Sequence, residues 1–181
     1  MKCLVFSDVH GSSYYMKKVI DCFEKEGCFK MICLGDLLYH GPRNDLPYGH
    51  NPKEVIELVN KYKDDIIMIR GNCEAEVDQM VLDFKIHDEM YLENGTVYLT
   101  HGHKVNPNNP INDPNVKIVL YGHSHVSLVS NVDDVLYINP GSVSIAKENT
   151  PNSLLIYDHG VCHWYNLDED EIKLYKSMKI K

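Results

Sequence analysis

Short apolar runs alternate with helix-periodic segments through the first half of the chain. Apolar runs over residues 2–6, 29–35 and 66–72 predict three buried strands. Residues 12–27 and 51–65 carry apolar side chains at helical spacing, and they predict the two helices between those strands. This order of strand, helix, strand, helix and strand predicts parallel strands that are joined by right-handed crossovers.

The second half has shorter apolar runs that are separated by turn residues. Hairpins are predicted over residues 90–102, 126–142 and 153–167, and single strands over an apolar run that ends before Gly122 and over residues 171–180. A parallel half followed by an antiparallel half predicts an α/β (α+β) fold with two packed sheets flanked by helices. We find no linker or internal repeat in the sequence and expect one domain that spans residues 1–181.

Composition and charge narrow the class of protein. The chain has 181 residues, of which 44% are hydrophobic and 24% charged, as is usual for a globular domain with a substantial core. No apolar run is long enough to span a bilayer, and the first residues lack the cleavage site of a signal peptide, so we expect a cytoplasmic protein without membrane contact. The formal net charge of −8 argues against long nucleic acid as a partner, because such binding needs a basic face. A small phosphate-bearing substrate stays open, since bound metal ions reverse the local charge.

The six cysteines are not arranged for a zinc framework. None belongs to a C-x-x-C pair, and most lie among apolar residues. We therefore expect buried, reduced thiols, with Cys73 as the one exception. The full set is Cys3, Cys22, Cys28, Cys33, Cys73 and Cys162.

Polar residues that are able to bind metal stand at the ends of several predicted strands, each close to a glycine. They are Asp8, His10, Asp36, Asn72, His101, His103, His123 and His125. In open α/β sheets, sites form just outside the carboxyl ends of the strands, so these distant segments are predicted to meet at one edge. Alone, each has an ordinary explanation, since Asp8 could cap a helix and Asn72 could serve a turn. Their joint occurrence favours a site.

Carboxylate, amide and imidazole ligands suit manganese, iron, zinc or magnesium better than copper(I) or an iron–sulfur cluster. The set is too large for one tetrahedral ion and fits two ions that share a carboxylate. A single bound ion is the alternative, and metal stoichiometry separates the two. No Ser-His-Asp arrangement or G-x-S-x-G elbow offers a protein nucleophile.

The segments DVHG, GDLLYHGP, GNCE, THGH and GHSH, in this order, resemble the motifs of the calcineurin-like metallophosphoesterase superfamily, and in particular a small bacterial branch of phosphodiesterases. The resemblance covers nearly the whole chain. It implies a four-layer αββα sandwich of two mixed β-sheets flanked by helices. It also implies a metal-dependent phosphodiesterase with a small phosphodiester substrate, and a homo-oligomer is left open.

The resemblance assigns ligands to two divalent ions. Manganese is expected first, with zinc, iron, nickel or magnesium as alternatives. One ion would be held by Asp8, His10, Asp36 and His125, and the other by Asp36, Asn72, His101 and His123, with Asp36 shared. A hydroxide between the two ions would attack phosphorus in line with the leaving oxygen. Asp36, Asn72, His101 and Arg43 are the residues expected to act in catalysis.

Substrate contacts are expected from Arg43, His40 and His103, although each has an alternative. Arg43 could donate two hydrogen bonds to phosphate, or it could pair with Asp45 at the surface. His40 lies on the same loop, and His103 could face the substrate or be a plain surface residue.

One position departs from the superfamily pattern, because Cys73 follows Gly-Asn where many members have a histidine. This leaves the general acid unassigned. A protein-binding module that has lost the chemistry is the competing function, and the complete ligand set argues against it.

Overall fold

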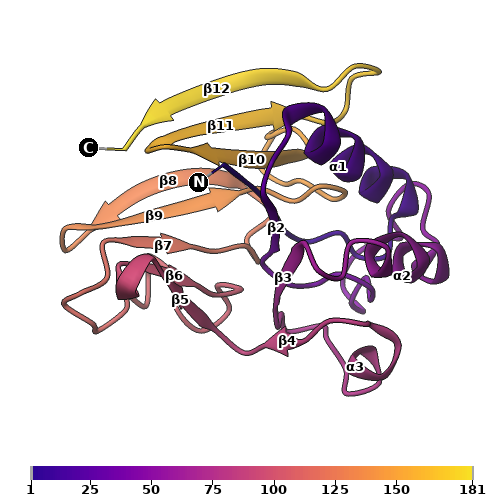
Figure 1. Cartoon of the computed structure of the whole chain (residues 1–181), viewed down its shortest axis with the longest axis horizontal. Coiled ribbons are helices and arrows are strands. Elements are labelled where there is room, and N and C mark those ends of the chain that lie inside the picture. Colours follow the sequence, from indigo (N-terminus) through magenta and orange to yellow (C-terminus); the bar gives the residue numbers. More distant parts are fainter. Residues whose placement is uncertain (1, 181) are drawn as a thin grey trace.

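Two β-sheets pack face to face in the computed structural model, which describes residues 2–180 (Figure 1). The larger sheet has seven strands in the order β12-β11-β10-β1-β2-β3-β4. Strands β1 to β4 are mutually parallel, whereas β10, β11 and β12 join them in antiparallel pairs. The bounds are β1 Cys3–Phe6, β2 Lys30–Cys33, β3 Ile66–Ile69, β4 Ile86–His87, β10 Ser153–Asp158, β11 Val161–Asn166 and β12 Lys173–Lys179.

The smaller sheet has five strands in the order β5-β6-β7-β9-β8. Strands β6, β7 and β9 are parallel, while β5 and β8 are antiparallel to their neighbours. The predicted α/β fold with two mixed sheets is therefore confirmed. The bounds are β5 Met90–Leu92, β6 Val97–Leu99, β7 Ile118–Leu120, β8 Ser127–Val132 and β9 Val135–Pro140.

Two predicted helices cover the outer face of the larger sheet. Helix α1 (Ser13–Glu26) begins where the Ser12 hydroxyl accepts a hydrogen bond from the Tyr15 amide, and it ends at Gly27 in the left-handed conformation. Helix α2 (Pro52–Asn60) is capped by Asn51 and is shorter than predicted, because the residues after it form turns that lead into β3. The sequence pattern missed β4 and the single-turn helix α3 (Asp78–Val81), which are too short to show a period. A 3-10 turn, η1 (Glu93–Gly95), follows β5.

Three apolar clusters fill the layers. One joins α1 and α2 to the larger sheet through side chains such as Met16, Val55 and Phe6. A second lies between the sheets and includes the fully buried Trp164, whose indole N–H donates to the Asn139 carbonyl over 3.0 Å. The third lies on the outer face of the smaller sheet and is closed by residues of the 102–117 segment. The two central layers agree with the sandwich prediction. On the outer face of the smaller sheet, however, the described residues form an irregular segment where a helix was expected. Val105, Ile111 and Val116 of this segment bury the apolar face of the sheet, so no helix is needed there.

All six cysteines are free thiols, and every one except Cys73 is buried, as expected. Among residues 2–180, no helix is both long and apolar enough to cross a bilayer.

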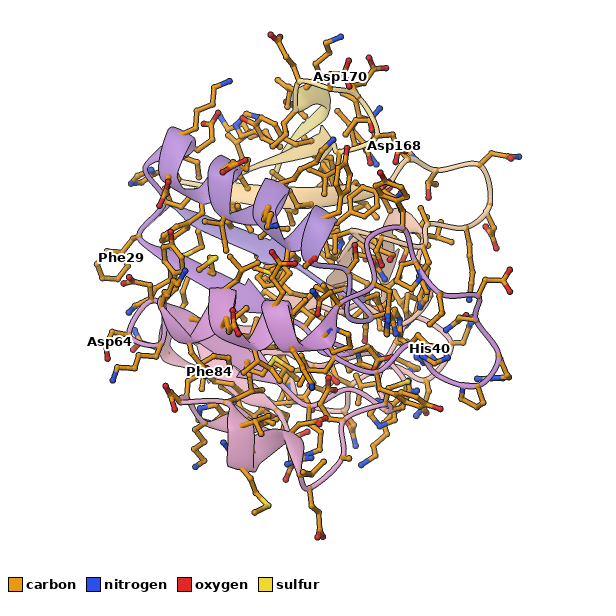
Figure 2. The ribbon with its side chains drawn as sticks, turned by 90° about the vertical axis from the view of Figure 1, so that its right-hand side faces the viewer. Phe29, His40, Asp64, Phe84, Asp168 and Asp170 are labelled. Carbon is orange, nitrogen blue, oxygen red and sulfur yellow. The ribbon has the colours of Figure 1, made fainter. Side chains whose placement is uncertain are left out.

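The loops after β1, β2, β3, β6 and β7 reach the same end of the molecule. Figure 2 shows this polarity: Phe29 and Asp64, which precede β2 and β3, lie at one end, and His40, which follows β2, lies at the other. The parallel strands thus deliver the polar residues that follow them to one edge.

Candidate metal centre

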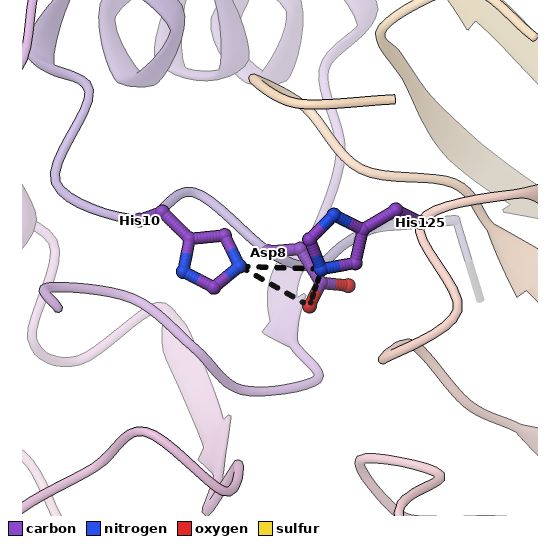
Figure 3. A group of neighbouring side chains, drawn as sticks. All are labelled: Asp8, His10 and His125. Carbon is purple, nitrogen blue, oxygen red and sulfur yellow. Dashed lines mark hydrogen bonds and ion pairs between the residues drawn. The ribbon is translucent and has the colours of Figure 1, made fainter. Parts of the chain in front are cut away.

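Asp8, His10 and His125 form the first group of candidate ligands (Figure 3). The Asp8 Oδ1 atom lies 3.7 Å from His10 Nε2 and 3.3 Å from His125 Nε2, and the two imidazole nitrogens are 3.3 Å apart. All three side chains are buried. Residues that are more than a hundred positions apart in the chain therefore meet at one point.

The Asp36 carboxylate lies between this group and a second one. Its Oδ2 atom is 3.8 Å from His10 Nε2 and 3.5 Å from His101 Nε2. The other oxygen, Oδ1, accepts a hydrogen bond of 2.9 Å from the Cys73 amide, and this bond fixes the carboxylate plane. Asp36 thus has the position that a shared ligand requires.

His101, Asn72 and His123 complete the second group. His101 Nε2 lies 3.1 Å from Asn72 Oδ1 and 3.3 Å from His123 Nδ1. Asn72 is exposed and faces the open side of the site, while His101 is fully buried. The structure brings together all seven residues that were predicted as metal ligands.

Backbone carbonyls set the tautomers of three imidazoles. The Nδ1–H groups of His10, His101 and His125 donate to the carbonyl oxygens of Tyr39, Leu34 and Ile145 over 2.7, 2.7 and 2.9 Å. A carbonyl oxygen only accepts, so Nδ1 carries the proton and Nε2 presents a lone pair to the centre. Such outer hydrogen bonds are the usual support of metal-binding histidines.

These lone pairs need a cation. In the neutral tautomers, His10 Nε2 and His125 Nε2 face each other and Asp8 Oδ1 with no donor between them. Asp8 Oδ1 is also a buried oxygen without a hydrogen-bond partner among the described residues. A buried, unpaired carboxylate oxygen is costly, and a divalent cation would satisfy it together with the two imidazoles. The residues present therefore fit divalent metal ions.

The charges of the side chains point the same way. Burial alone would raise the pKa of the Asp8 carboxyl, but the His10 and His125 imidazoles hold that pKa well below its ordinary value. Burial would likewise lower the pKa of His101, yet Asp36 and Asp8 raise that pKa to about 9. The raised pKa of His101 reflects the two carboxylate charges beside it, and the lowered pKa of Asp8 keeps that carboxyl ionised, so the centre keeps negative charge that attracts cations.

Five of the seven candidate ligands have left-handed backbone conformations. Their φ angles lie between 49° and 66°, at Asp8, His10, Asp36, His123 and His125. This region is uncommon for residues other than glycine, and strained backbone of this kind clusters at functional sites. The strain lets each loop turn back immediately after its strand and direct the side chain inward.

Glu74 is a support that sequence reasoning missed. Its carboxylate oxygens accept hydrogen bonds from the backbone amides of Asp36 (3.0 Å), Leu37 (2.7 Å) and Gly71. One side chain thereby ties the loop after β2 to the loop after β3. A Cβ on Gly71 would overlap the Asp36 side chain, which explains why glycine stands there. The GNCE segment contained this residue, but nothing in its spacing showed where the carboxylate points.

The end of β9 and the segment after it support the centre from the other side. The Asn139 side-chain Nδ2–H donates to the Gly122 carbonyl over 2.8 Å. Hydroxyls of Ser142 and Ser144 donate to the Asp8 carbonyl over 2.7 and 3.2 Å. These bonds position the loops that carry Asp8 and His123.

An open cleft with a volume of about 390 Å³ lies over the centre. Arg43 lines this cleft, and no ion pair joins it to Asp45 or to any other acidic residue in the described part of the chain. Lys147, which no sequence motif singled out, lines the cleft as well. Two cations at the mouth of a cleft in an acidic protein indicate an anionic ligand.

The remaining candidates have different surroundings. The His40 ring packs against Tyr39 and His50, with centroids 4.9 and 5.6 Å away, and it is not among the residues that line the cleft. The exposed His103 ring lies 5.5 Å from His101 and 6.1 Å from His123, at the rim of the centre. Burial and the Asp36 charge raise the pKa of Cys73 to about 12, so this thiol is a poor proton donor at neutral pH.

Comparisons with known proteins agree with this geometry. Residues 1–160 match the model of the calcineurin-like phosphoesterase superfamily domain. The chain is 39% identical over 176 residues to phosphodiesterase YfcE of Escherichia coli strain K12, with 95% of each chain covered. It is similar to the solved structure of YfcE, a phosphoesterase from E. coli, with a TM-score of 0.90, 36% identity and full coverage of both chains. Vps29 from Entamoeba histolytica shares the fold, with a TM-score of 0.67 at 19% identity and full coverage of both chains.

Proposed function

Because the chain belongs to the calcineurin-like phosphoesterase superfamily, we propose that it is a metal-dependent phosphodiesterase with a small diester as its substrate. The observation that carries this proposal is the Asp36 carboxylate, which lies within 3.8 Å of His10 and 3.5 Å of His101 and so stands between two groups of ligands. The 39% identity to a phosphodiesterase supports a diester over a monoester.

We assign Asp8, His10, Asp36 and His125 to one divalent ion and Asp36, Asn72, His101 and His123 to a second. Manganese is the first choice because the donors are oxygen and imidazole, and zinc, iron, nickel or magnesium are alternatives. When bound, a pair of divalent ions acidifies water and neutralises charge on a phosphoryl group.

The other residues of the cleft have distinct parts in this proposal. Arg43 and Lys147 draw the monoanionic diester into the cleft and contact its non-bridging oxygens. Asn72, on the exposed side, orients the phosphoryl group beside the centre. No serine or cysteine is needed as a nucleophile, because a pair of bound ions would supply the attacking water. The negative surface, with a net charge of −8, keeps long nucleic acid away.

The free, mostly buried cysteines are typical of a reducing compartment, and we propose the cytoplasm as the location.

The test starts from protein stripped of metal. We expect no hydrolysis of bis(p-nitrophenyl) phosphate by this form, and recovery of activity on addition of manganese, with two ions bound per chain by elemental analysis. The monoester p-nitrophenyl phosphate should be the poorer substrate. Protein that binds two ions and hydrolyses neither ester would be an inactive binding module, and the proposal would then be wrong. Saturation at one ion would favour a mononuclear site.

Arg43→Ala should raise KM for a diester roughly tenfold, the effect of losing one charge-assisted contact, with little change in kcat. The metal content should stay the same because Arg43 is not a ligand. Steady-state kinetics and elemental analysis measure the two quantities. Asp45→Ala is the matched control: equal effects of the two variants would mean that Arg43 acts through a surface ion pair, and metal loss from Arg43→Ala would refute substrate contact.

A further inference from the structure

A second cavity adjoins the cleft that holds the metal centre. Its volume is about 380 Å³, and it lies between the loop around residues 106–108 and strand β8. His123 lines both this cavity and the cleft, so the two spaces adjoin at this residue. The Nδ1 atom of that ring faces His101, and the opposite edge of the ring is therefore free to border the cavity.

The two cavities differ in chemistry. The cleft carries the cations Arg43 and Lys147, whereas the walls of the second cavity are mainly apolar, with Leu128 and Val126 among them. Neutral polar groups such as Asn108 interrupt the apolar surface. Among the described residues, Glu148 is the only Asp, Glu, Lys or Arg that lines this cavity. An anionic group would be repelled there, and an uncharged organic group would be accepted.

The size of the cavity also selects its occupant. A space of about 380 Å³ is at the lower end of the range for small-molecule sites and holds a five- or six-membered ring with its substituents. A methyl group would leave most of it filled with water. Because His123 borders both spaces, an ester arm that leaves the centre past this ring enters the cavity.

We propose that this cavity binds one ester arm of the substrate, and that the arm is neutral and carries a ring, as a sugar or an aryl alcohol does. This inference rests on the proposed phosphodiesterase function and deepens it, since a monoester has no second arm to place. The cavity then contributes binding energy that distinguishes a diester whose non-leaving arm carries a ring from one whose non-leaving arm is a small alkyl group.

Three diesters with the same leaving group test the proposal: the p-nitrophenyl esters of thymidine 5′-phosphate, of phenyl phosphate and of methyl phosphate. With the manganese-loaded protein, we expect a kcat/KM for the thymidine and phenyl diesters at least about tenfold above that for the methyl diester, the effect of one well-filled subsite.

Variants of β8 connect the preference to the cavity. Leu128 is 44% exposed on this strand, so Leu128→Trp fills the cavity while a strand-forming residue is kept. We expect the ratio of kcat/KM between the thymidine and methyl diesters to fall about tenfold in this variant. Asn131→Trp is the matched control, because Asn131 is exposed on the same strand and does not line this cavity.

The results of these experiments distinguish a wrong assignment of the cavity from a wrong assignment of the function. A wild-type protein that hydrolyses all three diesters without preference, or a ratio that Leu128→Trp leaves unchanged, overturns the assignment of the cavity and leaves the phosphodiesterase in place. An equal loss of preference in Asn131→Trp also overturns it. If no diester is hydrolysed, the proposed function fails and this inference fails with it.

Discussion

Asp36→Asn is expected to lower kcat/KM for diester hydrolysis by roughly 10²- to 10³-fold, the range seen when one electrostatic partner of a transition state is removed. The Asp36 carboxylate lies close to both groups of imidazoles, with Oδ2 at 3.8 Å from His10 and 3.5 Å from His101. An amide in its place keeps the shape and loses the negative charge that two cations would share. Steady-state kinetics on manganese-loaded protein measure the change.

The fold should survive this substitution. Asn retains an oxygen at the Oδ1 position, so the 2.9 Å bond from the Cys73 amide is kept. We expect a similar melting temperature for the metal-free variant and the metal-free wild type, and a loss of bound ions by elemental analysis. Asp45→Asn, on the same loop and exposed, serves as the control. Hydrolysis at nearly the wild-type rate by Asp36→Asn would show that this residue is not the shared ligand.

The sequence was sufficient to predict that the candidate ligands meet, because each follows a strand and parallel strands end at one edge. Asp8 after β1, Asp36 after β2 and Asn72 after β3 needed only that rule. The directions of these side chains depend on the left-handed backbone at Asp8 and Asp36. No local sequence pattern predicts this conformation for an aspartate.

Other parts of the site depend on contacts between segments that are remote in sequence. Lys147 reaches the cleft because the chain after β9 folds back along the loop of His125, where the Lys147 amide donates to the His125 carbonyl over 3.0 Å. The segment over residues 102–117 that packs on the outer face of the smaller sheet was also not predicted from the sequence. Its apolar residues, such as Ile111, are scattered over an irregular segment without a period of 2 or 3.6.

Glu74 should matter almost as much as the ligands, because it holds them in place. Its two oxygens accept from three backbone amides, of Asp36, Leu37 and Gly71. Burial raises the pKa of this carboxyl, and the nearby Asp36 charge adds to the effect, so the three amide donors are what keep an ionised group acceptable there. The three amides lie in loops beyond the ends of β2 and β3, so no neighbouring strand accepts their hydrogen bonds and Glu74 takes that part.

Glu74→Ala would leave those three amides without a protein acceptor, at a cost of about 1–3 kcal/mol for each one that water does not reach. We expect a lower free energy of unfolding, measured with urea, together with weaker metal binding. Glu74→Gln is the sharper variant, because it keeps the size and one acceptor oxygen but turns an NH₂ group towards a backbone N–H.

For Glu74→Gln we expect a folded protein whose manganese dissociation constant rises about tenfold or more, as is usual when an outer support of a metal site is lost. Activity should return when the manganese concentration is raised, because Glu74 touches neither metal nor substrate. Glu76→Gln, two residues further along and exposed, is the matched control and should bind metal as the wild type does. Unchanged metal affinity in Glu74→Gln would mean that the loops after β2 and β3 hold their positions without this carboxylate.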